Sequence, residues 1–579
     1  MNRRDDELRI RPGRIRVGGG LSATKAKSFI ARALAATEKA GGLHRAHGGR
    51  RSGAFGRGRA ASLAASRSLT SRSRGVVIKA RVVRHGAKAA PLGPHVAYLK
   101  REGASRDGEA GRLFDAGAEN VEDKSFAERC DGDRHHFRFI VSPEDAPELA
   151  DLKTYTRELM ADMTRDLGTQ LDWVAVEHWN TEHPHVHVLV RGRADDGADL
   201  VIGRDYISKG LRARAEQLAT LELGPRSEQE IRRGLERQVE VERFTPLDRS
   251  LVREAARHEG LLDLRPGANP ASEPDRQLLI GRARKLERLG LATPVGSGRW
   301  QLPEETEPTL RALGERGDVI KTMHRALHRG GIDRSANIAL HAEAEAPPIV
   351  GRLVERGLHD ELTGSAYAVI DGTDGRAHHV RLRDLEATGD GAPGAVVELR
   401  RFEDRTGAAR VALAVRSDLS LEAQITAPGA TWLDRQAVSK GAAALSDSGF
   451  GREVRAALEA RTEHLVAEGF ANRQGQRVLF ARDLLGALRR RELSAACGRI
   501  AAETGLAHHD VATGEHVSGV YRRRLTLASG RFAMLDDGLG FQLVPWSPSL
   551  EKQLGRHVSG VATPGGVDWS FGRKKGLGL

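Results

Sequence analysis

The sequence predicts an α+β chain, in which an antiparallel sheet flanked by helices is followed by helical regions and small β domains. Two observations carry this prediction. Apolar and polar residues alternate with period two in short stretches such as VVIKARVVRH and HPHVHVLVRG, which is typical of half-buried strands. Longer stretches such as DLKTYTRELMADMTRDLG lie between them and carry the apolar period of a helix.

Length, charge and cysteine content limit the class of protein. At 579 residues the chain is long enough for three or more domains. Its 91 Lys and Arg residues outnumber 78 Asp and Glu residues, and the formal charge of +13 favours a polyanionic partner, nucleic acid before membrane. Its two cysteines exclude a disulfide framework and a thiolate metal site. Because we find no membrane-spanning apolar run and no signal peptide, we expect a soluble cytoplasmic protein without membrane insertion.

Shifts in composition divide the chain into six regions. The first, residues 1–74, is rich in Gly, Ser and Arg, and we expect a disordered basic arm that either grips phosphates or is a solvated tail. The others are a first folded domain (75–240), a helical region with the element order of a winged helix (245–345), a small β domain (346–420), a second helical region (430–505) and a C-terminal β region with a basic tail (506–579).

The first folded domain is expected to begin near Gly75 with a strand, followed by a short helical turn over residues 95–102 that carries Tyr98. The next strand, FRFIV, leads into Ser142, which we expect to cap a long helix with Pro143 at its first position. The amides at such a helix start, together with the Ser142 hydroxyl, can hold a phosphate, although a plain N-cap is a sufficient explanation.

The stretch EHWNTEHPHVHVLVRG carries a cluster of histidines on a predicted hairpin. Alternation places His185 and His187 on one face of a strand, opposite Val186 and its apolar neighbours. If the preceding run LDWVAVEH is the partner strand, His178 faces His185 or His187 across the ladder. Three converging neutral imidazoles are good metal ligands and a poor core, because each buried ring nitrogen needs a partner. For this cluster we therefore predict a metal site in preference to the alternative, in which solvent-exposed histidines merely decorate a polar sheet face.

The second half of the chain carries fewer chemical signals. A helix over residues 278–289, followed by two short strands with a turn at Gly296, suggests a recognition helix and wing, or an unrelated helix and hairpin. Residues 308–345 are expected to be helical and 349–415 to be β, with Asp-Gly turns. The adjacent His378 and His379 face opposite ways in a strand, so we predict no second metal site there. EHVSGVY and RHVSGVA form a short internal echo, expected to be two strands of similar role.

Taken in order, HVAYLKREG, FRFIVSPED and HWNTEHPHVHVLVRG resemble the three motifs of conjugative relaxases. These are mobilisation nucleases of the HUH endonuclease superfamily, and the likeness is closest to the VirD-like type with a long C-terminal extension. It covers residues from about 76 to 225. The resemblance implies that Tyr98 is the nucleophile, that Ser142 contacts DNA, and that His178, His185 and His187 hold the metal.

The resemblance also marks a departure and a set of supporting residues. Relatives often carry an acidic residue two places after the first histidine, where this chain has Asn180. Which group polarises a ligand histidine is therefore open, with Glu177, Glu182 or Asp133 as substitutes. The residues expected to support the site or contact DNA are Ser142, His183, Glu177, Asn180, Lys100 and Arg101.

A relaxase nicks one DNA strand at the transfer origin of a plasmid or other mobile element. The resemblance implies that Tyr98 attacks the phosphodiester and becomes joined to the 5′ phosphate with the help of a divalent ion. We expect this ion to be magnesium or manganese, with zinc as the alternative. The implied partners are single-stranded DNA, accessory relaxosome proteins and a type IV secretion coupling protein in a bacterial cytoplasm.

Two other classes of function remain open at the level of sequence. A rolling-circle replication initiator or a single-strand transposase uses the same chemistry, but initiators commonly use paired tyrosines, and no second tyrosine lies near Tyr98. A non-enzymatic DNA-binding regulator would use the winged helix and the basic arm, with the histidines holding a structural zinc.

Overall fold

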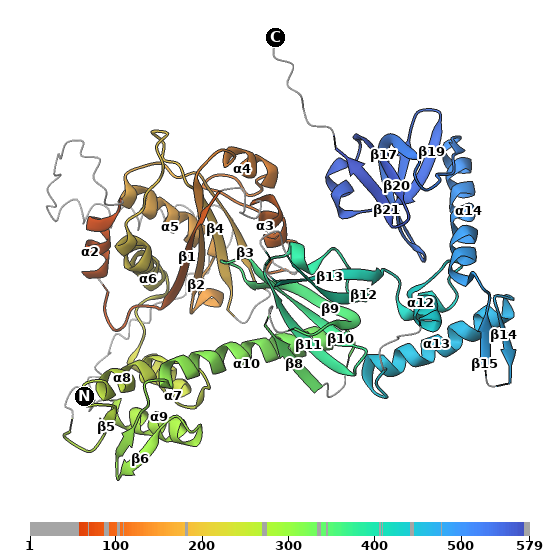
Figure 1. The fold of residues 1–579 in the computed structure, drawn as a ribbon. Coiled ribbons are helices and arrows are strands. Elements are labelled where there is room, and N and C mark those ends of the chain that lie inside the picture. Colours follow the sequence, from red (N-terminus) through yellow and green to blue (C-terminus); the bar gives the residue numbers. More distant parts are fainter. Residues whose placement is uncertain are drawn as a thin grey trace, which may run out of the picture. The chain divides into compact units, whose positions relative to one another are not determined.

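The computed structural model describes residues 57–571 with short gaps (Figure 1), and all of them belong to one compact unit that begins at Arg57. The chain is α+β, as predicted, with several antiparallel sheets. Inside this range the residues that are not described are 68, 86–91, 101–104, 108, 180–182, 269–274, 333–336, 343–345, 404–406, 408, 440–444 and 476. None of the helices in the described part is long and apolar enough to cross a membrane.

The first sheet has four strands, β1 (Val76–Arg84), β2 (His135–Pro143), β3 (Trp173–His178) and β4 (His185–Arg191). Their order is β1-β2-β4-β3, and every neighbouring pair is antiparallel. The strands expected from the alternating stretches are all present. The last two form the predicted hairpin.

Helices cover both faces of this sheet (Figure 1). α5 (Leu152–Leu167) and α6 (Leu211–Leu223) pack on one face, where Val186, Val188 and other apolar side chains form the larger core. α3 (Leu92–Leu99) and α4 (Asp123–Arg129) pack on the other face against β3 and β4. The histidine face of the hairpin is therefore the face that α3 and α4 cover. It is not an open polar surface.

Two local expectations in this domain differ from the structure. Ser142 does not cap a helix, because β2 stays paired with β1 as far as the partners Val76 and Pro143. The helix α5 begins ten residues later, at Leu152, where the Asp151 side chain accepts hydrogen bonds from the amides of Lys153 and Thr154. The cap at Asp151 and the continuing β1–β2 ladder outweigh the tendency of Ser142 to cap a helix.

Order also begins earlier than the expected Gly75. Residues Arg59–Arg67 form the helix α2, whose Ser62 hydroxyl donates to the Asp205 carbonyl at the start of a π-helical turn (η2, Tyr206–Gly210) before α6. Residues 1–56, the rest of the expected basic arm, lie outside the described residues.

The next region begins with α7 (Glu228–Glu240) and then follows the element order of the expected winged helix. α8 (Pro246–Ala255), β5 (Leu261–Asp263) and α9 (Arg276–Arg288) precede the hairpin of β6 (Thr293–Gly296) and β7 (Arg299–Gln301). The three strands pair in the order β5-β7-β6. A long helix, α10 (Thr306–Arg329), follows. It ends before residue 345, because β8 (Asn337–His341) pairs with a strand of the next sheet.

The small β domain is a six-stranded sheet in the order β13-β12-β9-β10-β11-β8. Its strands after β8 are β9 (Ile349–Asp360), β10 (Ser365–Gly372), β11 (Arg376–Leu382), β12 (Val396–Glu403) and β13 (Ala409–Ser417), with a short 3-10 helix (η4, Glu386–Thr388) after β11.

The second helical region contains α11 (Leu421–Ile425), α12 (Trp432–Val438), α13 (Gly449–Ala467), the hairpin β14 (Ala471–Gln474) and β15 (Arg477–Phe480), and the long helix α14 (Leu484–Thr504). The final sheet contains β16 (Ala507–His508), β17 (His516–Leu527), β18 (Gly530–Asp536), β19 (Gly540–Pro545), β20 (His557–Thr563) and β21 (Gly566–Ser570), with a short 3-10 helix (η5, Pro548–Gln553) after β19.

The final sheet repeats the topology of the small β domain. Its order is β16-β19-β18-β17-β20-β21, which is the order of the six-stranded sheet of the small β domain when β8–β13 are matched one by one to β16–β21. The strand directions agree as well: the pair β8–β11 and its counterpart β16–β19 are parallel, and the other neighbouring pairs are antiparallel. In both sheets a long helix, α10 or α14, precedes the first strand. The echo EHVSGVY and RHVSGVA is separate from this repeat, since its two strands, β17 and β20, are direct neighbours.

A close backbone approach recurs at matched positions of the two sheets. A Cβ on Gly351 in β9 would lie 2.3 Å from the carbonyl oxygen of Asp371, and one on Gly519 in β17 would lie 2.8 Å from that of Asp536. Only glycine fits such an approach. The two sheets therefore match in the position of this glycine as well as in strand order.

A buried arginine is repeated in the two helical regions. Arg282 in α9 donates to both carboxylate oxygens of Asp248, at 2.7 and 2.9 Å, and Arg461 in α13 donates to those of Asp434, at 2.8 and 2.9 Å. Each aspartate also closes a capping box with the threonine three residues before it. Both guanidinium groups donate to three further carbonyls, of Val239, Val241 and Arg243 in one copy and of Ile425, Ala427 and Gly429 in the other. These carbonyls occupy the same positions relative to the threonine.

Removing either arginine should leave a buried, uncompensated aspartate. We expect Arg282→Ala and Arg461→Ala each to lower the free energy of unfolding by ~3–5 kcal/mol, because the side chains of both partners are almost fully buried. Guanidinium denaturation followed by circular dichroism measures this change. Arg284→Ala, an exposed arginine on α9, is the matched control. A loss below ~1 kcal/mol in both variants would contradict a structural role for the pair.

Candidate metal centre

The β3–β4 hairpin brings the three predicted histidines together. His178, the last residue of β3, is the direct partner of His185, the first residue of β4. His187 lies two residues further along the same face of β4. The ring centroids of His178 and His187 are 4.4 Å apart, and those of His185 and His187 are 4.9 Å apart.

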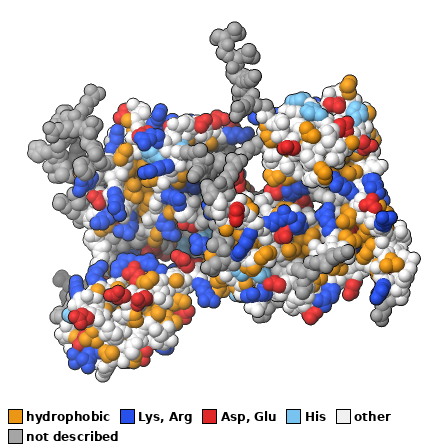
Figure 2. All heavy atoms as spheres, in the orientation of Figure 1, with side chains coloured by type: hydrophobic (Ala, Val, Ile, Leu, Met, Phe, Trp, Pro, Cys, Tyr) orange, Lys and Arg blue, Asp and Glu red, His pale blue; other side chains and the backbone are white. Residues whose placement is uncertain are grey.

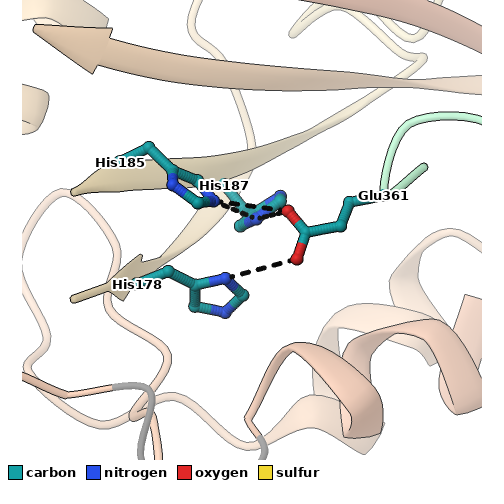
Figure 3. A group of neighbouring side chains, drawn as sticks. All are labelled: His178, His185, His187 and Glu361. Atoms are coloured by element: carbon teal, nitrogen blue, oxygen red, sulfur yellow. Dashed lines mark hydrogen bonds and ion pairs between the residues drawn. The ribbon is translucent and has the colours of Figure 1, made fainter. Parts of the chain in front are cut away.

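Glu361 is the fourth member of the group (Figure 3), and sequence reasoning missed it. It lies in the turn between β9 and β10, residues 361–364, which we call the β9–β10 turn. One oxygen of its carboxylate lies 2.7 Å from His187 Nε2 and 3.3 Å from His185 Nε2, and the other lies 3.7 Å from His178 Nδ1. No local motif marks this glutamate. It is separated from the histidines by more than 170 residues and comes from another sheet.

Two backbone carbonyls set which ring nitrogens face the common point. His178 Nε2 donates to the Leu99 carbonyl at 2.8 Å, and His185 Nδ1 donates to the His183 carbonyl at 2.9 Å. Because a carbonyl only accepts, these contacts place the proton on the outer nitrogen of each ring and leave the inner nitrogen as a lone-pair donor. Outer hydrogen bonds of this kind orient histidines in metal sites.

The electrostatics of the group also suit a cation. Burial lowers the pKa of His187 to about 4, so its ring is neutral at pH 7. Burial alone would raise the pKa of Glu361, but the facing His187, His178 and His185 hold it well below its ordinary value. The group therefore offers a neutral imidazole at His187 and an ionised carboxylate at Glu361.

The donor set and its spacing fit a divalent metal ion. The four ligand atoms all lie within 4.8 Å of one another, and the Nε2 atoms of His185 and His187 are 3.1 Å apart. Ligands ~2.0–2.2 Å from a common ion lie ~3–4.4 Å apart, which is close to these distances. Imidazole nitrogens with a carboxylate oxygen are ligands for several transition metals. His178, His185, His187 and Glu361 could therefore hold one ion.

Two of the expected supporting residues lie beside this group without belonging to it. Ser142 lies near the end of β2, next to the hairpin, and its hydroxyl donates to the Pro184 carbonyl at 3.3 Å. His183 is exposed and contributes its backbone carbonyl to His185.

Two expected acidic substitutes lie elsewhere. Glu177 points to the opposite face of β3 from His178 and lines a separate cavity of about 270 Å³ with Lys153 and Trp179. Asp133 accepts hydrogen bonds from Arg191, at 2.7 and 3.2 Å, and is not among the ligand group. Neither carboxylate polarises a ligand histidine. The Leu99 and His183 carbonyls fill that role for two of the rings.

The expected nucleophile lies on the helix next to the metal group. Tyr98 is the penultimate residue of α3, and its neighbour Leu99 provides the carbonyl that accepts from His178. The side chain of Tyr98 lies outside the described residues, as do Arg101, Asn180 and Glu182 entirely. Lys100 directly follows α3, and its amide donates to the Val96 carbonyl.

Two buried side chains next to the group were also missed. His95 in α3 is buried, and its pKa is well below the ordinary value because of burial and the nearby charge of Arg138. Arg138 in β2 lies on the histidine face of the sheet, since its cross-strand partner is Leu189, two residues from His187. Alternation in the sequence shows which residues share a face with Arg138, but it does not show that this face is the one that carries the histidines.

Comparison with known proteins adds one relationship to this α+β chain with its histidine and glutamate cluster. A family model described as "Protein of unknown function (DUF3363)" matches residues 279–409 and 399–578, more than half of the chain. The chain belongs to this family. Searches of curated proteins and of solved structures each gave no match. Glu361 lies inside the matched region, whereas the three histidines precede it.

Replacing a ligand histidine should weaken metal binding. We expect His185→Ala and His187→Ala each to lower the affinity for Zn²⁺ and for Mn²⁺ by more than about tenfold, because even outer partners of metal ligands contribute that much. Isothermal titration calorimetry measures the affinity. His183→Ala, which keeps the carbonyl contact to His185, should bind as the unaltered chain does. If all three variants bind the metal ions as tightly as the unaltered chain does, this group holds no ion.

Proposed function

We propose that the chain is a DNA relaxase of the HUH type, which nicks one strand at the transfer origin of a plasmid or other mobile element. One observation carries the proposal: His178, His185 and His187 converge on one face of an antiparallel sheet, and the helix that carries Tyr98 is hydrogen-bonded to the first of them. The order of the three sequence motifs and the net charge of +13 support it further.

The other tyrosines are poor nucleophiles, which supports Tyr98 by elimination. Tyr155, Tyr206 and Tyr521 are almost fully buried, and burial raises the pKa of each. Tyr367 donates its hydroxyl to Glu355 in the small β domain. None of these four residues belongs to the helix next to the histidines.

The proposed reaction is a transesterification that conserves the number of phosphodiester bonds. The Tyr98 oxygen forms a bond to the scissile phosphorus, and the bond between phosphorus and the 3′ oxygen breaks. The phenol loses its proton, and the departing oxygen takes one up as a 3′ hydroxyl. Reversal rejoins the strand without ATP. A divalent ion held by the histidines would supply positive charge to the phosphate during this exchange.

The chain's own residues prepare this step. The phenol has an ordinary pKa of about 10, so neighbouring cations that favour the phenolate raise its reactivity. Lys100 and Arg101 follow Tyr98 in sequence, and the proposal assigns them this role toward both phenolate and DNA. Accessory relaxosome proteins and a secretion coupling protein are the further partners that this function requires.

A structural metal in a DNA-binding regulator is the second candidate, and one observation favours it. Three histidines and Glu361 form a set of four protein ligands, and closed sets of four are typical of structural sites. A regulator binds DNA without forming a covalent adduct. An assay for a covalent adduct between the chain and DNA therefore separates the two candidates. A rolling-circle initiator or a transposase would also give an adduct in this assay.

Phenylalanine at position 98 should abolish the covalent adduct. Incubation with single-stranded DNA that spans candidate transfer origins and is labelled at its 3′ end should leave label on the denatured unaltered chain, because the downstream fragment stays attached through its 5′ phosphate. Tyr98→Phe removes only the attacking oxygen, so binding to the DNA should change by no more than a few-fold. Tyr367→Phe is the matched control and should still form the adduct. A peptide map that places the DNA on any residue other than Tyr98 would refute this mechanism.

The basic arm should contribute to DNA affinity without reading sequence. On the face shown in Figure 2, Lys and Arg side chains are spread among Asp and Glu side chains. If residues 1–56 neutralise phosphates, their deletion should flatten the dependence of single-strand binding on salt, by about 0.7 for each phosphate that the arm neutralises. Fluorescence anisotropy at several salt concentrations measures the slope. The preferred nick sequence should stay the same, and an unaltered slope would show that the arm does not touch DNA.

A further inference from the structure

We infer that Arg138 is a second phosphate-binding residue beside the metal centre, and that the β9–β10 turn covers both until single-stranded DNA displaces it. The inference rests on the proposed function, which it extends from the chemistry of the site to its regulation. Five features support it: the position of Glu361, the poor compensation of Arg138, the closeness of Arg138 to the metal group, the position of the turn over Arg138, and the contrast with the second copy of the β sheet.

Glu361 occupies the place that a substrate phosphate would need. The three histidines approach the common point from the sheet, and the Glu361 carboxylate approaches it from the β9–β10 turn (Figure 3). A carboxylate and a phosphodiester both present anionic oxygens to a cation. A catalytic ion must keep a position open for its substrate, so the carboxylate and the DNA phosphate compete for the same place.

Arg138 is a cation whose charge is poorly compensated. Its side chain is 6% exposed, and its one hydrogen bond among the described residues runs from Nε to His136 Nε2, at 3.0 Å. Its direct cross-strand partner is another cation, Arg81, and like charges in that arrangement repel. Burial and the charge of Arg81 lower the pKa of Arg138 to about 10. An anion at this position would relieve both costs.

Arg138 is also close enough to the metal group to act on the same strand of DNA. His187 pairs with Ile140, and Arg138 is two residues further along the same face of β2. Diagonal neighbours of this kind are separated by ~7–8 Å. Lys79 and Arg81 continue the face onto the exposed edge strand β1. A strand whose phosphate reaches the histidines can place its next phosphates on these cations.

The β9–β10 turn lies over Arg138 as well as over the histidines. A Cβ on Gly364, at the end of the turn, would lie 3.8 Å from Arg138 Nη1. The turn is internally braced, since the Asp360 carboxylate accepts hydrogen bonds from the amides of Leu362 and Thr363. Glu361 and Gly364 are therefore held in one rigid segment, which covers the two phosphate positions together.

The matching turn in the second β sheet is built differently. It consists of residues 528 and 529 between β17 and β18, two residues fewer than the β9–β10 turn. The amides of Ala528 and Ser529 donate to Glu492 in α14, at 2.8 and 2.9 Å, so this turn is bound by its own helical region. The longer turn and its glutamate are thus specific to the copy that reaches the metal group.

The test compares the binding of fluorescein-labelled (dT)30 to full-length variants by anisotropy in the presence of Mn²⁺. Glu361→Gln keeps the shape of the side chain and removes its charge, so we expect about tenfold tighter binding if the cover is closed in about nine chains of ten. Glu386→Gln, an exposed glutamate of the same β domain, should change nothing. Adding Arg138→Ala to Glu361→Gln should remove most of the gain.

Calorimetry with Mn²⁺ alone identifies the opposing result. If Glu361 is a permanent ligand, Glu361→Gln weakens Mn²⁺ binding by about tenfold or more and gives no gain in DNA affinity, and the inference is overturned. A gain that survives Arg138→Ala overturns the role given to Arg138.

The adduct assay separates this inference from the proposed function. If an adduct forms on Tyr98 but Glu361→Gln gives no gain in DNA affinity, the proposed nuclease stands and the proposal that the β9–β10 turn covers the site is rejected. If Glu361→Gln gives a gain in DNA affinity but no adduct forms, the turn covers an anion-binding site and the proposed nuclease is rejected.

Discussion

The register of the β3–β4 hairpin is the constraint on which the site depends. Pairing of His178 with His185 places all three histidines on one sheet face, and a slip by one residue in either strand would send its histidines to the opposite face. The valines of β4 fix the register, because Val186, Val188 and Val190 fill the core under α5 and α6. The hydrophobic effect on one side of the strand thus aligns the ligands on the other.

Local patterns predicted the parts of the site that lie on one hairpin. Period-two alternation was enough to place His185 and His187 together, and the polar turn before Pro184 was enough to bring His178 opposite. Glu361 could not be found in this way, because its position depends on packing between two sheets. The Ser142 cap was wrong for a related reason: pairing with β1 kept that segment extended, and this long-range ladder outweighed a local capping preference.

The internal repeat was also invisible to pattern analysis. Topology is kept by strand order and by a few positions, such as the close approaches at Gly351 and Gly519 and the buried Arg282 and Arg461. Most other positions only need to be apolar and of about the right size, so the two copies share little sequence. An arginine that links an aspartate in the first turn of a helix to three carbonyls of the preceding segment fixes the geometry between that helix and the chain before it. Such a device tolerates few substitutions, whereas strands tolerate many.

The continuity of β9 couples the metal group to a larger body. β9 is a single strand of 12 residues, about 40 Å long, that pairs with β10 along most of its length and with β12 at the end far from the turn. A strand held in this way moves with its sheet, so withdrawal of Glu361 requires the hairpin to bend or the sheet to shift. In the proposed relaxase, thermodynamic reciprocity implies that any ligand of this sheet that favours the withdrawn position would bind more tightly once DNA occupies the histidine face, by the same factor that it adds to DNA binding. The sheet would thereby report to other molecules whether a DNA strand is engaged.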